Sequence, residues 1–229
     1  MRAEKTKETQ YQSSVTLRKA QGLTPLGSVA NLVWHDDPRH LLFILARYKF
    51  VAKMLSGKKS VLEVGCGDAF WTRLVLQEVG RVYAVDFDPI FVEDANKRME
   101  AKWKFKCKVH DILSAPVDGV FDGAYSLDVL EHIRKAEERQ FMSNIVHSLH
   151  KEGVLVIGMP SRQSQVYASK RSKEGHTNCK DHGELKELML RYFHNAFVFS
   201  MNDEVVHTGF YPMAHYLFAV GAGKRDDKT

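Results

Sequence analysis

The sequence predicts an α/β fold with a mostly parallel sheet, on three observations. Short apolar runs alternate with segments whose apolar residues repeat at helical spacing, as in strand–helix–strand units. One such run, Val61–Val64, leads directly into a turn of small residues. A second run, Arg81–Asp86, ends in an acid about twenty residues beyond that turn, as in nucleotide-binding sheets. With 229 residues, the chain has room for one domain of this class with a sizeable core.

The first turn reads Val61-Leu-Glu-Val-Gly-Cys-Gly-Asp-Ala-Phe70. Gly65 and Gly67 lack a Cβ and tolerate positive φ, so a ligand can lie against the main chain. Glu63 precedes the turn, where its carboxylate would accept hydrogen bonds from a loop or a ligand. The helix expected over residues 70–79 would begin above the same place. The pattern predicts a site for an adenosine-type ligand, although glycines after a strand also occur in plain strand-to-helix turns.

The acid that ends the second run narrows the class of possible ligands. Asp86 stands where such a unit presents a carboxylate to ribose hydroxyls, and it is the candidate ribose ligand. Asp88, followed by Pro89, is expected to cap the next helix, and a capping role for both acids is the alternative. The third glycine of the dinucleotide fingerprint is replaced by Phe70. A ring there disfavours a bound pyrophosphate, and with it a nicotinamide-dependent oxidoreductase.

Four segments, in their order along the chain, resemble motifs of the class I S-adenosylmethionine-dependent methyltransferases with small-molecule acceptors. They are Leu62–Gly67, Tyr83–Asp86, the fourth-strand segment Phe121–His132 and the fifth-strand segment Gly153–Pro160. The resemblance spans roughly residues 58–161 and departs from the family at Ala69, where many members carry a third glycine. It implies a Rossmann-like, seven-stranded, mostly parallel sheet with helices on both faces and an antiparallel last strand. It also implies S-adenosyl-L-methionine as cofactor and S-adenosyl-L-homocysteine as product.

The resemblance further implies cofactor contacts, position by position. They are Gly65 and Gly67 at the methionine part, with Cys66 and Glu63 beside them; Asp86 at the ribose; Phe87, Asp111 and Ile112 at the adenine; and Leu127 and Asp128 under the cofactor. For Asp111, a turn acid without a ligand is the alternative.

A helix is predicted after Asp37 and Pro38, because apolar residues from Leu41 to Leu55 repeat at helical spacing. Arg47 lies at the edge of the apolar face. Related enzymes use a helix at this place in the cofactor pocket, so the resemblance implies that Arg47 pairs with the methionine carboxylate. Trp34 or His35 would then close over the site. A surface cation and a loop anchor are the alternatives for these positions.

The net charge of +5 and the pI near 9.0 raise the question of a nucleic-acid partner. The base-amino methyltransferases place an Asn- or Asp-Pro-Pro-aromatic sequence after the fourth strand, where this chain has Leu127–His132. No cysteine follows a proline, as the cytosine-C5 enzymes require. Both observations disfavour nucleic acid, and the basic N-terminal segment 1–33 is expected to be a flexible, solvated stretch.

The domain is expected to cover residues 34–222, followed by a polar tail, 223–229. Cys66, Cys107 and Cys179 provide no disulfide framework, and neither a signal peptide nor a long apolar span is visible. We therefore expect a soluble, cytoplasmic protein without a membrane span. The sequence does not indicate the oligomeric state, and a homodimer stays open.

Substrate recognition is expected beyond the carboxyl ends of the strands, in an insert at about 159–182 and a loop at about 202–215. The candidate acceptor-binding residues are Ser161, Tyr167, Asp203 and Tyr211. A hydroxyl acceptor would require a base, and histidine is suited to this near neutral pH. The candidates, in order, are His207, His176 and His132; a structural role is the alternative for His132.

A zinc site at His176, Cys179 and His182 would need a fourth ligand that is not evident nearby, so no metal is expected. The predicted function is in-line transfer of a methyl group to a small polar acceptor, preferably a hydroxyl of a sugar, glycan or related metabolite. The alternatives are a catalytically silent cofactor-binding regulatory protein and a nucleic-acid methyltransferase.

Overall fold

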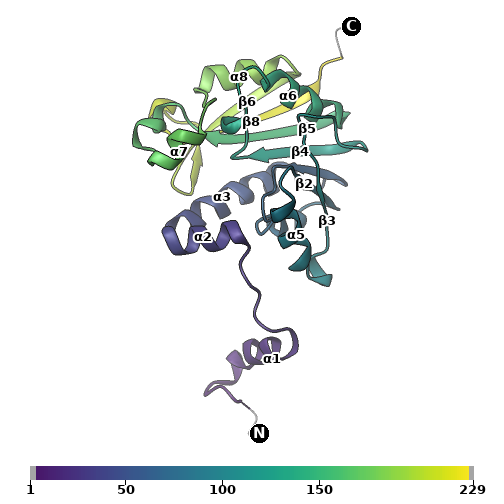
Figure 1. Cartoon of the computed structure of the whole chain (residues 1–229), viewed down its shortest axis with the longest axis vertical. Helices are drawn as coiled ribbons and strands as arrows, with labels where there is room; N and C mark the ends of the chain where they lie inside the picture. The colour runs from purple at the N-terminus through teal and green to yellow at the C-terminus, as the bar shows by residue number, and fades with distance from the viewer. Residues whose placement is uncertain (1–3, 227–229) are drawn as a thin grey trace.

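An eight-stranded sheet runs through the molecule in the order β3-β2-β1-β4-β5-β8-β6-β7 (Figure 1). The structure, a computed structural model, describes residues 4–226. The strands are β1 (Val61–Val64), β2 (Val82–Asp86), β3 (Lys106–Val109), β4 (Phe121–Leu127), β5 (Leu149–Pro160), β6 (Phe193–Asn202), β7 (Val205–His207) and β8 (Tyr216–Lys224). Strands β1 to β5 are mutually parallel, and β8 lies antiparallel between β5 and β6. The predicted fold class is confirmed, and the short strand β7 adds an eighth strand at the edge.

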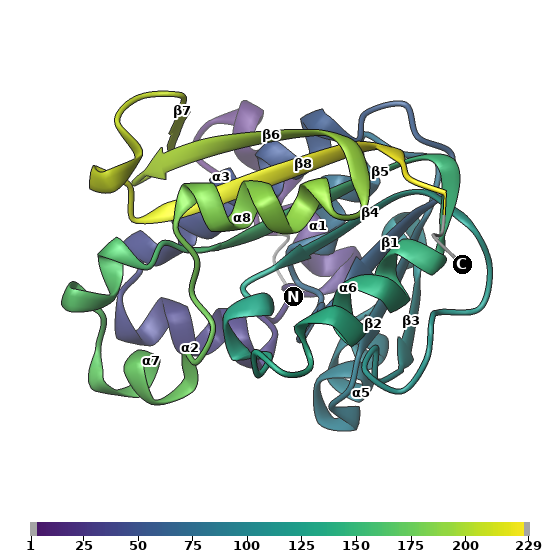
Figure 2. The ribbon, with the colours of Figure 1, turned by 90° about the horizontal axis from the view of Figure 1, so that it is seen from above.

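Helices cover both faces of the sheet, as Figure 2 shows from above. Those packed on one face are α3 (Arg39–Met54), α4 (Thr72–Leu76) and α5 (Pro89–Lys97); those on the other are α6 (Glu138–His147) and α8 (His182–Leu190). The predicted cap of α5 is confirmed, because the Asp88 carboxylate accepts a hydrogen bond from the backbone N–H of Ile90 at 2.9 Å. None of the helices within residues 4–226 is long and apolar enough to cross a membrane.

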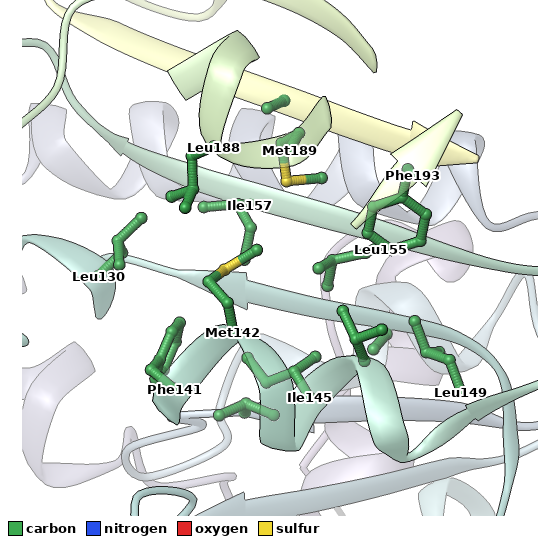
Figure 3. Close-up of a cluster of buried hydrophobic side chains, with 14 of the residues drawn as sticks. Leu130, Phe141, Met142, Ile145, Leu149, Leu155, Ile157, Leu188, Met189 and Phe193 are labelled. Carbon is green, nitrogen blue, oxygen red and sulfur yellow. The ribbon is translucent and has the colours of Figure 1, made fainter. Parts of the chain in front are cut away.

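Two apolar clusters hold these layers together, one on each face of the sheet. Figure 3 shows the cluster beneath α6 and α8, where Phe141, Met142 and Leu188 meet Leu155 and Ile157 of β5. All four residues of β1 are buried, which explains why that strand reads as a continuous apolar run around its single glutamate. This packing fixes the strands and thereby the edge from which their connecting loops emerge.

The functional candidates gather at the carboxyl edge of the parallel strands. The turns after β1, β2, β3 and β4 all leave the sheet at this edge, because the strands are parallel. The segment after β5 joins them there and contains the 3-10 helix η4 (Gln163–Tyr167) and α7 (Lys170–Gly175). Since β6 runs parallel to β5 and β8 returns between them, the β6–β8 connection also lies at this edge.

The N-terminal segment is more structured than the sequence predicts. It contains α1 (Gln12–Gln21), which stands apart from the sheet in Figure 1, and α2 (Ser28–Asp36). The first turn of α2 is docked on the glycine turn, because Asp68 accepts hydrogen bonds from the backbone N–H groups of Val29 (2.7 Å) and Ala30 (3.1 Å). A carboxylate from elsewhere in the chain thus caps this helix, and local sequence patterns carry no signal for that contact.

Candidate active site

The turn between β1 and α4 has the backbone that its small residues predict. Gly65, Gly67 and Ala69 have φ values of 79°, 52° and 51°. A Cβ on Gly65 would overlap Cγ2 of Val129, a residue of the loop after β4. Glycine is therefore required at position 65 both by its φ and by the close approach of that loop. Between the two glycines, Cys66 turns its sulfur inward, 3.9 Å from the sulfur of Cys107.

Asp86, at the end of β2, is 7 % exposed and braces this turn. One carboxylate oxygen accepts a hydrogen bond from the N–H of Gly67 at 2.8 Å, and the other accepts one from the N–H of Asp88 at 2.9 Å. A carboxylate has about four acceptor positions, so two are left for a ligand. The next residue, Phe87, is 73 % exposed.

Asp111 and Ile112 lie in the turn after β3, one at the surface and the other in the core. Asp111 is exposed, and one of its carboxylate oxygens accepts a hydrogen bond from the N–H of Leu113 at 2.9 Å, as in a turn. Ile112 is buried and belongs to the apolar cluster beneath α6. Asp111 and Phe87 therefore follow neighbouring strands at the same edge, where an adenine would have to lie.

Glu63 faces the protein core. Its carboxylate accepts hydrogen bonds from the Tyr48 hydroxyl of α3 at 2.9 Å and from the Thr72 hydroxyl of α4 at 2.5 Å. Burial raises the pKa of Glu63 to about 7, and these hydrogen bonds offset only part of the effect. Its contacts join two helices to β1, so the structure does not aim this side chain at the open edge.

Arg47, on α3, is paired with Asp128, the residue that follows β4. One guanidinium nitrogen lies 3.0 Å from both carboxylate oxygens of Asp128, and the guanidinium carbon lies 3.9 Å from the centre of the Tyr216 ring. Asp128 has a φ of 57°, and its N–H donates to the carbonyl of Gly158, while Leu127 before it is buried. Arg47 and Asp128 thus neutralise each other, a contact that the sequence analysis did not foresee.

Several polar atoms at this edge of the sheet are buried without a hydrogen-bond partner among residues 4–226. They are Nε of Arg47, Oε2 of Glu131, Oε1 of Gln163, Nε2 of His215 and the hydroxyl of Tyr216. Buried polar groups are nearly always hydrogen-bonded, because an unpaired one costs about 1–3 kcal/mol. All five belong to segments at the carboxyl edge of the sheet, which indicates a place built for polar partners.

Two of the three candidate histidines meet at this edge. The rings of His132 and His176 are 5.1 Å apart between centroids and meet edge to face. Glu131, next to His132, is almost completely buried, and its burial, followed by the nearby Asp128, raises its pKa well above the usual range. Burial also lowers the pKa of His176, with the neighbouring His132 adding to the effect.

His207, the first-ranked candidate base, is placed elsewhere. It belongs to the edge strand β7, five strands from β1, or about 24 Å at a strand spacing of about 4.8 Å. Both ring nitrogens are also engaged, one with the Asn202 side chain at 2.8 Å and one with the N–H of Gly209 at 3.0 Å. The structure therefore does not bring His207 together with the glycine turn.

The four candidate acceptor-binding residues are also placed differently, some with exposed side chains and some with side chains used in structural contacts. Ser161 is fully buried, and its hydroxyl donates to the carbonyl of Ala214, so it joins two loops. Tyr167 is 90 % exposed on η4, and Tyr211 stacks on His182 with 4.9 Å between ring centroids. Asp203 lies in the tight turn between β6 and β7 with a φ of 49°. Of these four, Tyr167 and Tyr211 present side chains near the loops that border the edge.

The sequence analysis missed four residues of this site: Glu131, Gln163, His215 and Tyr216. Glu131 lies three residues after Asp128 and directly before His132, so the fourth-strand segment itself contained that signal. Gln163 and His215 fall within the insert 159–182 and the loop 202–215 that the sequence analysis expected to recognise the acceptor, and Tyr216 directly follows that loop, but no motif singled out these three side chains.

Comparison with known proteins agrees with this geometry. Residues 61–153 match a family model described as a methyltransferase domain. Over these residues the chain is similar to methyltransferase domains. The matched segment contains the glycine turn, Asp86 and the Asp128–His132 segment, whereas Arg47, Gln163, His176, His215 and Tyr216 lie outside it.

Solved structures show the same fold at low sequence identity. The N-methyltransferase NodS from Bradyrhizobium japonicum WM9, in complex with S-adenosyl-L-homocysteine, is 19% identical with a TM-score of 0.59, and the match covers 94% of this chain and 99% of that one. DhpI, in a complex with SAM and HEP, is 16% identical with a TM-score of 0.62, covering 97% and 100%. The methyltransferase domain of bacterial CtHen1-C is 14% identical with a TM-score of 0.63, covering 80% and 97%. No curated protein sequence matches the chain.

Proposed function

We propose that the chain binds S-adenosylmethionine at the glycine turn and transfers its methyl group to a hydroxyl of a small polar acceptor. When bound, the cofactor supplies a methyl group on a positively charged sulfur. The residues fit such a group: Gly67 lacks a Cβ and has Val29 as the nearest side chain, Gly65 lets Val129 approach the turn, and Asp86 keeps two acceptor positions for ribose hydroxyls. Phe87 and Asp111 would border the adenine, from the ends of β2 and β3.

The observation that supports a polar acceptor is the set of buried polar atoms without hydrogen-bond partners. Gln163, His215 and Tyr216 each hold one such atom; Gln163 follows β5, and His215 and Tyr216 lie at the start of β8, at the same edge of the sheet as the end of β4. An acceptor rich in hydroxyl groups would satisfy these atoms, whereas an apolar acceptor would leave them unpaired at about 1–3 kcal/mol each. This favours a sugar, glycan or related metabolite.

The methyl transfer requires that the acceptor oxygen is aligned with the methyl group and that the proton of the acceptor hydroxyl is removed. The lone pair of the acceptor oxygen forms the new O–C bond as the C–S bond breaks, and the electron pair of the C–S bond stays on sulfur. The hydroxyl proton must leave, and His132 and His176 are the imidazoles at this end of the site. Because the displacement is in line, positioning by the Arg47–Asp128 pair and Val129 would supply most of the rate.

The test has a binding arm and a transfer arm. Calorimetric titration with S-adenosylhomocysteine is expected to show one site per chain, with no heat from NADH as the control. Methyl transfer from labelled S-adenosylmethionine is then followed with matched panels of polyhydroxylated and amine acceptors. Turnover confined to the hydroxyl panel supports the proposal; turnover confined to amines refutes the oxygen acceptor; and the absence of S-adenosylhomocysteine binding refutes the function.

A further inference from the structure

Three side chains beside the proposed acceptor form a cluster with no structural explanation yet. Glu131 and His132 lie in the 3-10 helix η3 (Leu130–His132), directly after β4, and His176 follows α7. One carboxylate oxygen of Glu131 and one ring nitrogen of each histidine all lie within 4.8 Å of one another. The fold thus brings His176 to two residues that are more than forty positions earlier in the chain.

The hydrogen bonds of both imidazoles fix which nitrogen is available. Nδ1 of His132 lies 3.0 Å from the carbonyl oxygen of Gly175, and Nδ1 of His176 lies 2.8 Å from the side-chain oxygen of Gln165. These oxygens only accept, so each Nδ1 must carry the proton and donate. In each neutral ring, Nε2 therefore offers a lone pair. A ring nitrogen held by an oxygen acceptor in this way is typical of histidines that bind a metal through the other nitrogen.

One oxygen of the Glu131 carboxylate lacks a hydrogen-bond partner within the described part of the chain. The residue is 1 % exposed, and its Oε2 makes no hydrogen bond to any described residue. The nearby cation does not supply one, because both hydrogen bonds of Arg47 go to Asp128. A buried carboxylate oxygen without a partner is costly, and a cation bound by this oxygen and the two histidines would remove that cost.

The spacing and the donor types also suit a metal ion. Ligands at about 2.0–2.2 Å from one ion lie roughly 3–4 Å apart, so donor atoms within 4.8 Å need only a small side-chain rotation to reach it. Two imidazoles and one carboxylate are donors for first-row divalent transition metals, whereas magnesium and calcium prefer all-oxygen sets. Three protein ligands leave further positions open, as in catalytic sites.

We propose that Glu131, His132 and His176 bind one divalent transition-metal ion, whose open positions take an oxygen of the methyl acceptor. The site itself stands on the cluster geometry, and its catalytic part rests on the proposed function. A hydroxyl held by such an ion would lose its proton to solvent at lower pH, and its oxygen would then form the O–C bond as the C–S bond breaks, with the electron pair of the C–S bond staying on sulfur. His132 and His176 are ligands in this arrangement and do not act as the base. This differs from the sequence analysis, which expected no metal.

The binding experiment uses the untagged chain after removal of metal with a chelator. Titration with Co²⁺ is followed by its visible absorption, which reports nitrogen coordination, and titration with Mn²⁺ by the loss of the free-ion signal in electron paramagnetic resonance. One ion per chain is expected. Glu131→Gln and His176→Gln are each expected to weaken Co²⁺ binding by at least tenfold, since even outer partners of metal ligands contribute about 10–100-fold.

A matched control variant distinguishes metal binding at the proposed site from metal binding to surface histidines. His147→Gln removes an imidazole near the C-terminal end of α6, the end away from the site, and Co²⁺ affinity should not change. Each variant is checked for S-adenosylhomocysteine binding, which must persist if the fold is intact. If wild-type protein binds Co²⁺ only at millimolar concentration, or if His147→Gln reduces binding as much as His176→Gln does, the site does not exist.

Measurements of methyl transfer then distinguish a failure of this inference from a failure of the proposed function. Metal-stripped enzyme should bind S-adenosylhomocysteine normally, lose methyl transfer to the hydroxyl acceptor, and regain it with added Mn²⁺ or Zn²⁺. Full transfer by stripped enzyme, together with its loss in His176→Gln, would make His176 a free base and overturn the metal role alone. Absent S-adenosylhomocysteine binding with stoichiometric Co²⁺ binding would overturn the proposed function and leave the metal site standing.

Discussion

Glu63 makes the stability of this protein depend on pH in a direction opposite to that of most carboxylates. The side chain is 1 % exposed, and burial raises its pKa from 4.5 to about 7. The folded state therefore binds more protons than the unfolded state between these two pH values. By linkage, the free energy of unfolding falls as the pH rises from about 4.5 through about 7, and it is constant beyond that range for this group.

The size of the effect follows from the same shift. A difference of one pKa unit corresponds to about 1.4 kcal/mol, so ionising Glu63 costs on the order of 3 kcal/mol above pH 7. Glu63→Gln removes this ionisation but keeps the shape. Its amide still accepts from one of the Tyr48 and Thr72 hydroxyls, and the other hydroxyl can rotate to accept from the amide N–H.

The assay is urea denaturation of wild type and Glu63→Gln at pH 5, 6, 7 and 8. The variant should equal or fall below the wild type at pH 5 and exceed it by roughly 3 kcal/mol at pH 8. Glu93→Gln, an exposed glutamate of α5, controls for the change in net charge and should show no such crossing. A constant difference between wild type and Glu63→Gln from pH 5 to pH 8 would refute the reasoning.

Three further predictions concern the glycine turn. Asp86→Ala removes the acceptor that braces Gly67 and would hold the ribose, so S-adenosylhomocysteine affinity in calorimetry should fall by about 10–100-fold; unchanged affinity excludes the ribose role. Gly65→Ala forces a Cβ onto Val129 and should destabilise the fold by about 1–3 kcal/mol in thermal unfolding. Adding Val129→Ala should recover part of this loss, and no recovery would place the strain in the backbone alone. Asp68→Ala removes the cap of α2 at about 0.5–2 kcal/mol, so limited proteolysis within residues 22–36 should accelerate, whereas an unchanged cleavage rate would mean that the cap does not hold the helix.

Much of the fold was predictable because its signals are local. The apolar runs that became β1, β2, β4 and β5, the glycines with positive φ and the Asp88–Pro89 helix start each depend on neighbouring residues. The short strand β7 was not predicted, since three residues at a sheet edge carry no periodicity. The docked helix α2 was missed for a different reason: its cap, Asp68, lies almost forty positions away.

For the site, the sequence by itself determined the glycine turn, the acid at the end of β2 and the segment from Asp128 to His132. It could do so because strand, turn and acid follow one another within single strand–helix–strand units. Only the tertiary structure decided which histidines matter, because His176 reaches His132 through a long loop, whereas His207 lies at the far edge of the sheet. The same packing turned Arg47 onto Asp128 and left Oε2 of Glu131 buried without a hydrogen-bond partner among the described residues, since burial and pairing depend on elements distant in the chain.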